Sequence, residues 1–359
     1  MRVRALDLDA ARYARHALHA EDLAWTEKNC YFDVWIEVLN ALGCEPTAVI
    51  PSLVAIDFLG DQWTFFKPSH DELRSLYGVD VQELTCWRPL LEHAIEHLGA
   101  GRLIATEADA WWLPDVAGTD YRRQHVKTTI VLADVDVGQR RLGYFHNAGY
   151  FSLEGEDFDR TFRIGQEGDR AVDPQQHLPL YAELLRIDRV SRRPAAELRA
   201  MSRQLLGTHL ALRPRDNPID RFAERFALEL PRLQERGLPH YHAWAFATLR
   251  QLGAASELLA CHLRWLVADD GAQAGQDAGA SAASELQREQ ALRAAEAFDS
   301  VSAGTKAFIL KAARAVNTRR AFDFAPSFEA WSAAWQDGQT ALSSWLSLEP
   351  VHDPAALAR

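Results

Sequence analysis

The segment from Tyr31 to Leu42 is almost entirely apolar. Three polar residues interrupt it at a spacing of i, i+4 and i+7: Asp33, Glu37 and Asn40. This spacing places them on one narrow stripe of a helix, so the pattern predicts a central helix whose remaining surface is buried. Asn29 and Thr26 precede the run as candidate cap residues, which places Cys30 in or beside the first helical turn.

The rest of the first 165 residues alternates between strand-like and helix-like patterns. Alternating apolar and polar residues predict strands in five segments: 62–67, 79–87, 103–109, 126–137 and 140–151. The last two flank Gly138 and predict a long antiparallel hairpin. Short helices are predicted at 69–78, which opens with a capping box of Ser69 and Glu72, and at 88–99. A central helix with a mostly antiparallel sheet predicts an α+β fold.

From about Val172 onward, the pattern changes to helical periodicity. Long amphipathic runs occupy three segments: 222–236, 241–267 and 285–301. They predict a helical bundle. Residues 269–283 are rich in Gly and Ala and poor in large apolar side chains, so we expect a mobile loop there between two bundle helices. These patterns divide the chain into an α+β domain at 1–165 and a helical domain at 166–359.

The composition of the 359-residue chain narrows the class of protein. Apolar residues make up 48% of it, enough to fill the cores of two domains. Four cysteines without a C-x-x-C pair are typical of a reduced, cytoplasmic protein. The charged N-terminus does not resemble a signal peptide, and without a run of about 18 apolar residues we expect no membrane span. The net charge of -11 argues against nucleic-acid binding, which needs a basic surface.

One basic segment departs from this acidic average. Between Arg186 and Arg215 lie eight arginines and only two acidic residues, a local charge of eight minus two, or +6. The segment is either a solvated helix face with ordinary salt bridges or a dock for an acidic partner or a phosphate-bearing arm. Arg189, Arg192 and Arg193 are the candidate docking residues.

Three residues suggest cysteine chemistry. A helix N-terminus favours a negative charge, so it favours the nucleophilic thiolate form of Cys30, although a cysteine there can also be a small buried apolar residue. His125 opens an apolar strand, and the hairpin returns the chain so that Asn147 or His146 could reach its imidazole. Cys, His and Asn in this order predict a nucleophile, a general base and an orienting amide. We expect no metal, because no closely spaced ligand pair accompanies these residues.

Further residues could line a substrate pocket near His125. They are Asp109, Trp111, Trp112, Tyr121 and His146. The two tryptophans could equally belong to the core. Asn29 and Thr26, which stand just ahead of Cys30, are the candidates for oxyanion support.

Two family resemblances add to this interpretation. Asp109, Leu113 and Pro114, followed by His125 and a return strand ending near Asn147, resemble the N-terminal domain of the butirosin-biosynthesis acyltransferase family, a relative of the papain-like C39 peptidases. The stretches TEKNCYFDVWIE, GDQWTFFKP, GTDYRRQHVKTT and GYFHNAGYF also resemble a bacterial family catalogued as a domain of unknown function.

The first resemblance implies a papain-like fold and a cysteine-dependent acyltransferase. In this expectation, an acyl or aminoacyl group passes from the phosphopantetheine thioester of a carrier protein to Cys30 and then to a small-molecule amine or hydroxyl acceptor. His125 acts as the base and Asn147 takes the place usually held by Asp. The protein itself needs no cofactor. Two alternatives remain: a cysteine peptidase or amidase, and a catalytically silent scaffold that binds a peptide or carrier. The sequence does not indicate an oligomeric state.

Overall fold

The computed structural model of the chain describes residues 1–164, 181–268 and 278–347. Contacts divide the chain into two compact units. Residues 1–49 and 67–195 form the first, here called the sheet unit, and residues 50–66 and 196–359 form the second, the helical unit. The segment 50–66 lies in the α+β half of the sequence but belongs to the helical unit, and the boundary between the two units falls near residue 195 rather than at 165.

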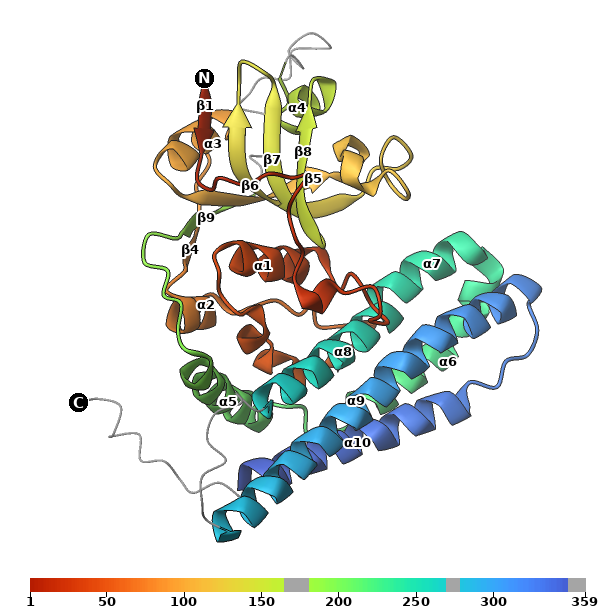
Figure 1. Cartoon of the computed structure of the whole chain (residues 1–359). Helices are drawn as coiled ribbons and strands as arrows, with labels where there is room; N and C mark the ends of the chain where they lie inside the picture. The colour runs from red at the N-terminus through yellow and green to blue at the C-terminus, as the bar shows by residue number, and fades with distance from the viewer. Residues whose placement is uncertain (165–180, 269–277, 348–359) are drawn as a thin grey trace. The chain divides into compact units, whose positions relative to one another are not determined.

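A seven-stranded antiparallel sheet is the framework of the sheet unit (Figure 1). Its strands are β1 (Arg2–Arg4), β4 (Asp80–Glu83), β5 (Leu103–Asp109), β6 (Lys127–Asp136), β7 (Arg141–His146), β8 (Gly149–Glu154) and β9 (Ala182–Arg186). Six of them follow the order β4-β9-β5-β6-β7-β8, and β1 pairs with the C-terminal end of β6. Every pairing is antiparallel, which confirms the predicted α+β class for this part of the chain.

Helix α1 (Cys30–Ala41) packs against β6 and β7 on one face of this sheet. Phe32, Val34, Trp35 and Ile36 are all 1% exposed or less, so the predicted central, buried helix is confirmed. Three shorter helices complete the unit: α2 (His70–Tyr77), α3 (Leu90–Gly99) and α4 (Glu156–Thr161).

Two strand predictions differ from the structure, and one strand was missed. The predicted strand at 140–151 is wrong as a single strand, because the chain turns back at Asn147 and Ala148 and separates β7 from β8. Asn147 has φ 44°, a left-handed conformation that asparagine tolerates better than most residues. The strand expected at 62–67 is only two residues long (β3, Gln62–Trp63) and pairs with β2 (Phe58–Leu59). Strand β9 was not predicted.

The helical unit confirms the predicted bundle. Its helices are α5 (Ala195–Ala211), α6 (Pro218–Arg236), α7 (Leu238–Ala247), α8 (Leu249–Leu266), α9 (Ala278–Thr318) and α10 (Ala325–Ser347). Helix α9 packs along both α8 and α10 (Figure 1). Residues 269–277 of the predicted loop lie outside the described residues, and the remainder of that loop, from Ala278, belongs to α9.

Aromatic side chains form the core of the helical unit. Phe226 contacts Phe308 and Phe328 from neighbouring helices, at centroid distances of 5.4 and 5.5 Å. Phe58 and Trp63 pack on Phe222, with centroids 5.0 and 5.6 Å away. Four of these six side chains are 1% exposed or less, and Trp63 and Phe328 are each 3% exposed. This burial explains why the segment 50–66 folds with the helices.

Candidate functional site

Asn29 is the N-cap of α1, and Cys30 is the first helical residue. The Asn29 Oδ1 atom accepts a hydrogen bond from the Phe32 backbone N–H at 2.8 Å, which ends the extended segment before the helix. The Cys30 side chain is half-buried and its thiol is free. Thr26 lies half-buried in the bend before α1.

The Cys30 thiol faces β6. Its Sγ atom donates a hydrogen bond to Thr129 Oγ1 at 3.7 Å. Thr129 stands directly opposite Glu107 of β5 in the antiparallel register, so the two side chains point to the same face of the sheet as the thiol. Lys127 Nζ lies 3.0 Å from Glu107 Oε1 on this face. The thiol therefore lies beside a hydroxyl, on the face of the sheet that also carries this ion pair.

A histidine–aspartate pair lies at the end of the same two strands. His125 Nδ1 is 2.6 Å from Asp109 Oδ2, and its ring stacks on Trp111 at a centroid distance of 4.5 Å. Asp109 Oδ1 also accepts a hydrogen bond from the Trp111 backbone N–H at 3.1 Å. The His125 side chain is 68% exposed, so the imidazole is open to solvent and to a ligand.

Cys30 and His125 are not in contact in this structure. His125 precedes Thr129, the neighbour of the thiol, by four residues, which corresponds to about 13 Å between their Cα atoms in an extended chain. The imidazole makes its hydrogen bond to Asp109 rather than to the thiol. The His125–Asp109 pair lies where β5 ends and β6 begins, whereas Cys30 faces Thr129 further along β6.

His146 and Asn147 lie away from this pair. His146 is 1% exposed and bridges Asp115 Oδ2, 2.6 Å from Nδ1, and Thr128 Oγ1, 2.8 Å from Nε2. Thr128 and Thr129 are consecutive in β6, so His146 lies on the face of the sheet opposite the thiol. Asn147 occupies the β7–β8 turn. The hydrogen-bond partner of His125 in this structure is therefore Asp109 and not the expected Asn147.

Trp112 and Tyr121 form a separate cluster in the 110–126 connection. The Arg122 guanidinium lies 4.3 Å from the centroid of Trp112, and the Tyr121 hydroxyl donates to Asp157 Oδ2 at 2.9 Å. Arg122 also pairs with Asp157 Oδ1 at 2.7 Å. These contacts anchor the connection to α4, while Trp111 remains with His125.

A second polar group beside Cys30 was not predicted. Tyr31, the next residue of α1, donates its hydroxyl to Glu183 Oε2 at 2.8 Å, and Tyr181 donates to Oε1 at 2.7 Å. His70 Nε2 lies 3.4 Å from Glu183 Oε1. Burial, followed by the charge of Glu183, raises the pKa of Tyr31, so its hydroxyl remains a proton donor. The only sign of this polar group in the sequence was a single Glu in AELLR, the short and otherwise mostly apolar segment that forms β9.

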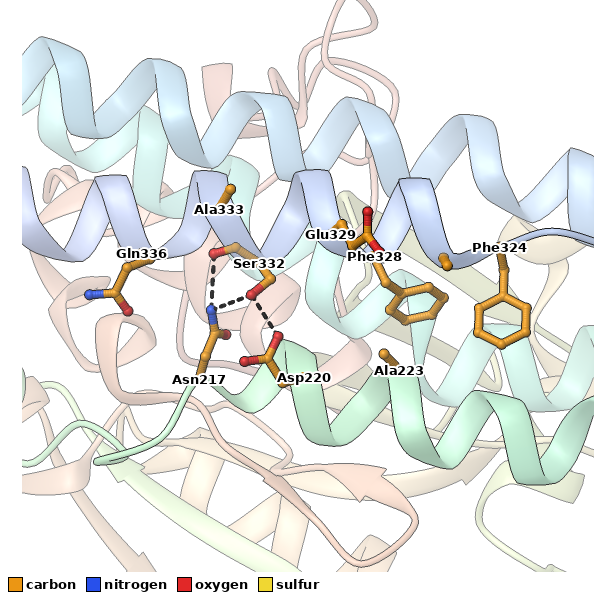
Figure 2. A pocket seen from close by; sticks show the side chains of 10 residues that line it. Asn217, Asp220, Ala223, Phe324, Phe328, Glu329, Ser332, Ala333 and Gln336 are labelled. Carbon is orange, nitrogen blue, oxygen red and sulfur yellow. Dashed lines mark hydrogen bonds between the residues drawn. The ribbon is translucent and has the colours of Figure 1, made fainter.

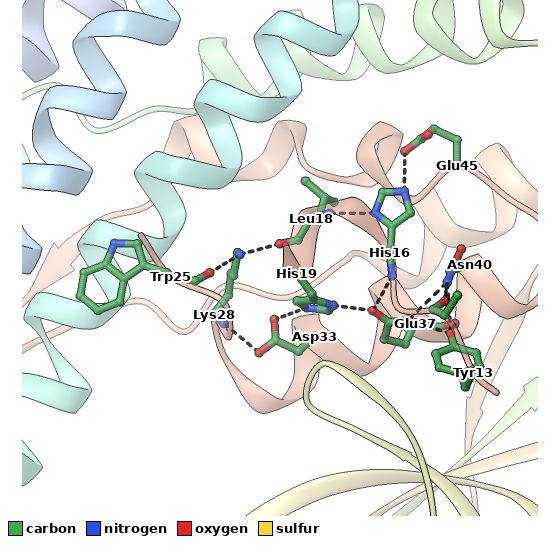
Figure 3. A network of polar contacts seen from close by, with 11 residues as sticks. Tyr13, His16, Leu18, His19, Trp25, Lys28, Asp33, Glu37, Asn40 and Glu45 are labelled. Atoms are coloured by element: carbon green, nitrogen blue, oxygen red, sulfur yellow. Dashed lines mark hydrogen bonds and ion pairs between the residues drawn. The ribbon is translucent and has the colours of Figure 1, made fainter. Parts of the chain in front are cut away.

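A buried network holds α1 in place (Figure 3). His19 is fully buried between two carboxylates of α1, with Nε2 3.1 Å from Asp33 Oδ1 and Nδ1 2.5 Å from Glu37 Oε1. Burial alone would lower the pKa of His19, but the hydrogen bonds to both carboxylates outweigh it and the pKa is raised. The Tyr13 hydroxyl also donates to Glu37 Oε2, at 2.7 Å. The polar stripe of α1 thus binds the N-terminal segment to the helix.

The three candidate docking arginines have different environments. Arg192 Nε donates to the Leu42 carbonyl at the end of α1 at 2.8 Å, and Arg193 Nε donates to the Leu76 carbonyl near the end of α2 at 2.9 Å. Both therefore satisfy carbonyl groups at helix C-termini. Arg189 is exposed and lines a hollow of about 350 Å³ with Arg74 and Arg186.

Two further searches of the described residues gave negative results. In residues 1–164, 181–268 and 278–347, no group of three His, Cys, Asp or Glu side chains could hold a metal ion. No helix among them is both long and apolar enough to cross a membrane.

Comparison with known proteins identifies the family but no activity. The sequence model of the DUF1839 N-terminal domain matches residues 14–187, and that of the DUF1839 C-terminal domain matches residues 195–344. No curated protein matches the chain. These comparisons lend no support to the resemblance to the butirosin acyltransferase. Because the two matches together cover most of the sequence, the chain belongs to the DUF1839 family.

Proposed function

We propose that this protein is a cysteine-dependent acyltransferase in which Cys30 carries the acyl group. The observation that carries the proposal is the position of Cys30: a free, half-buried thiol in the first turn of a buried helix, on the sheet face that also presents the His125–Asp109 pair. A helix N-terminus stabilises a thiolate and the oxyanion that forms when the thiolate attacks a carbonyl. A central helix bearing a cysteine against an antiparallel sheet is the arrangement expected of a papain-like fold.

The base in this proposal is His125, oriented by Asp109. A carboxylate on Nδ1 fixes the tautomer so that Nε2 can take a proton, and it stabilises the imidazolium that results. Asp109 is better suited to this role than the expected Asn147, because an amide has no charge to offer. The proposal requires His125 to leave Trp111 and approach Cys30 during turnover, which its 68% exposure permits.

The reaction has two halves. In the first, His125 takes the thiol proton, the Cys30 sulfur forms a bond to the carbonyl carbon of a thioester, and the donor thiol leaves with that proton. In the second, an amine attacks the acyl-Cys30 carbon, the carbon–sulfur bond breaks, and the amine proton passes through His125 to the Cys30 thiolate. A thioester donor suits a cysteine, because exchange between two thioesters is nearly balanced in free energy.

A carrier protein is the proposed donor, with Arg189 in its docking surface. Arg189 is the one of the three candidate arginines for which the described residues provide no hydrogen bond or ion pair, so its guanidinium is available to an acidic partner or to the phosphate of a phosphopantetheine arm. An Arg189→Glu variant is expected to slow acylation by a carrier-bound donor and to leave acylation by a free pantetheine thioester unchanged. If Arg189→Glu were acylated by the carrier-bound donor as fast as the wild type is, Arg189 would have no part in docking.

Intact-protein mass spectrometry tests the acyl-enzyme directly. The protein is incubated with an aminoacyl-pantetheine thioester, and the added mass is located by peptide mapping. We expect the added mass on Cys30 of the wild type and no added mass on the Cys30→Ala variant. The Cys86→Ala variant, which lacks another half-buried thiol, is the matched control and is expected to keep the added mass. Release of the label only by added amines supports transfer. Release by buffer alone indicates a hydrolase, and no label on Cys30 from any donor indicates a binding protein.

A further inference from the structure

Two adjoining hollows lie in the helical unit, along one face of α10. The larger has a volume of about 560 Å³ and the smaller about 220 Å³. Asn217 and Gln336 line both of them, so the hollows form one groove. The α10 residues that line it extend from Ala325 to Ser343, and the opposite wall comes from α6 and the segment before it. Neither hollow includes any residue of the cysteine site.

The smaller hollow carries two arginines, Arg213 and Arg215, and one carboxylate, Asp216, which lies 3.8 Å from Arg221 Nη1. Arg213 donates from its guanidinium to the Leu210 carbonyl at 2.7 Å, and its other terminal nitrogen lies 3.5 Å from Ser343 Oγ, which fixes it at the rim. Arg215 also lines this hollow and is exposed, without an ion pair among the described residues. Two guanidinium groups beside a polar hollow favour a carboxylate or phosphate.

Gln339 lines the same hollow, and its side chain carries a buried acceptor without a hydrogen-bond partner among the described residues. The residue is only 6% exposed, and its Nε2 atom donates to the Val54 carbonyl at 3.0 Å. This bond fixes the amide orientation and leaves Oε1 buried, with no hydrogen-bond partner among the described residues. An unsatisfied buried acceptor has a cost in free energy. A ligand that donates a hydrogen bond to Oε1 would remove this cost.

The larger hollow is acidic above an aromatic floor (Figure 2). Phe324 and Phe328 form the floor, and Asp220 and Glu329 supply carboxylates. Asp220 Oδ1 accepts a hydrogen bond from Ser332 Oγ at 2.6 Å, which leaves its second oxygen available. The groove is therefore basic at one end and acidic at the other.

We infer that this groove binds a free α-amino acid with a basic side chain. The α-carboxylate would lie on Arg213 and Arg215, the α-ammonium would donate to Gln339 Oε1, and the side-chain cation would reach Asp220. Arg213 contacts Ser343, one helical turn from Gln339.

The length of the groove fits the side chain of arginine or lysine. Ser332, which holds Asp220, and Gln339 are seven residues apart on α10, or about 10 Å along the helix axis. An extended basic side chain and one hydrogen bond span a similar length, and the phenylalanine floor accommodates its methylene groups. This inference concerns a site separate from Cys30, and it stands or falls independently of the proposed acyl transfer.

Isothermal titration calorimetry of the full chain with L-arginine tests the inference. Saturable binding is expected, with a dissociation constant at least tenfold weaker for Arg215→Gln. Arg232→Gln, an exposed arginine of α6 outside the groove, is the matched control and is expected to bind as the wild type does. Arg215 makes no contact that its loss would disrupt, so the variant is expected to fold.

Two analogues separate the recognised groups. Agmatine lacks the carboxylate and N-acetylarginine lacks the ammonium group, and both are expected to bind at least tenfold more weakly than arginine. Glutamate is expected to bind more weakly than either lysine or arginine, because Asp220 and Glu329 repel its side chain. Absence of arginine binding, equal binding of agmatine, or binding of inorganic phosphate in place of arginine would each overturn the inference.

Discussion

His125 Nδ1 lies 2.6 Å from Asp109 Oδ2, whereas Asn147 lies in the turn between β7 and β8. If His125 is the base for Cys30, replacing the carboxylate by an amide removes the charge that stabilises the imidazolium. We expect Asp109→Asn to lower the rate of Cys30 acylation about 100-fold. Asn147→Gly, which preserves the left-handed turn, is expected to leave the rate unchanged. The measurement is the initial rate of acyl-Cys30 formation by mass spectrometry. A slow Asn147→Gly variant together with an unaffected Asp109→Asn variant would show that Asn147, and not Asp109, supports the base.

The buried His19 predicts a pH-dependent contribution to stability. Because its pKa is raised, this contribution is complete below the ordinary pKa of 6.5 and is lost as the pH rises through the raised value. Glu37 has a lowered pKa, since the hydrogen bonds from His19 and Tyr13 outweigh burial, and its contribution is complete above 4.5 and lost at lower pH. The network is therefore most stabilising between these two values.

Comparing His19→Ala with the wild type tests this window. Removing the imidazole leaves two buried carboxylates without their partner, and we expect a loss of about 3–5 kcal/mol at pH 5.5. The free energy of unfolding is measured by urea titration at pH 5.5, 7.0 and 8.5. The difference between the two proteins is expected to shrink as the pH rises. A constant difference would show that His19 acts through packing alone.

Variants of Arg192 and Arg189 distinguish an arginine that caps a helix from one that is available for docking. Arg192→Gln removes the donor to the Leu42 carbonyl at the end of α1, so we expect the free energy of unfolding to fall by about 1 kcal/mol. Arg189→Gln is the matched control at an exposed side chain and is expected to change it by less than about 0.5 kcal/mol. Chemical denaturation checks both values, and a larger loss in Arg189→Gln would contradict the assignment.

Two glycines allow α9 and α10 to approach closely. A Cβ atom on Gly304 would lie 2.2 Å from Trp331 Nε1, and one on Gly338 would lie 2.9 Å from the Phe298 ring. We expect Gly304→Ala to destabilise the protein by about 1–3 kcal/mol through overpacking. Gly207→Ala in α5 is the control, because its nearest neighbour is 4.0 Å away, and it is expected to stabilise that helix. Thermal unfolding checks both predictions: the melting temperature is expected to fall in Gly304→Ala and to rise in Gly207→Ala.

The sequence allowed α1 to be predicted because its signal is local. A continuous apolar run with one polar stripe specifies a buried helix without knowledge of its neighbours. The partners of that stripe could not be predicted, since His19 and Tyr13 lie in a segment with no regular pattern. The bundle was likewise evident from helical periodicity, whereas the assignment of residues 50–66 to it depends on the aromatic contacts of Phe58 and Trp63.

The candidate site was predicted only in part, because its geometry depends on strand register. The hairpin suggested that Asn147 would face His125, but alternation continues through residues 140–151 and conceals the turn that separates β7 from β8. Asp109 ends β5, and only its pairing with Lys127 shows that it lies next to His125. Tyr31 and Glu183 meet across 152 residues, and no local pattern could have joined them.

The assignment of residues 50–66 to the helical unit limits how the chain can be divided. A fragment that ends near residue 195 would keep Phe58 and Trp63 but lose the helices that cover them, and it would expose both rings to water. A fragment that begins there would retain an aromatic core with a vacant place beside Phe222. Neither half is expected to fold into a stable, soluble protein when expressed alone. We therefore expect the two halves to have been inherited together, as one gene product.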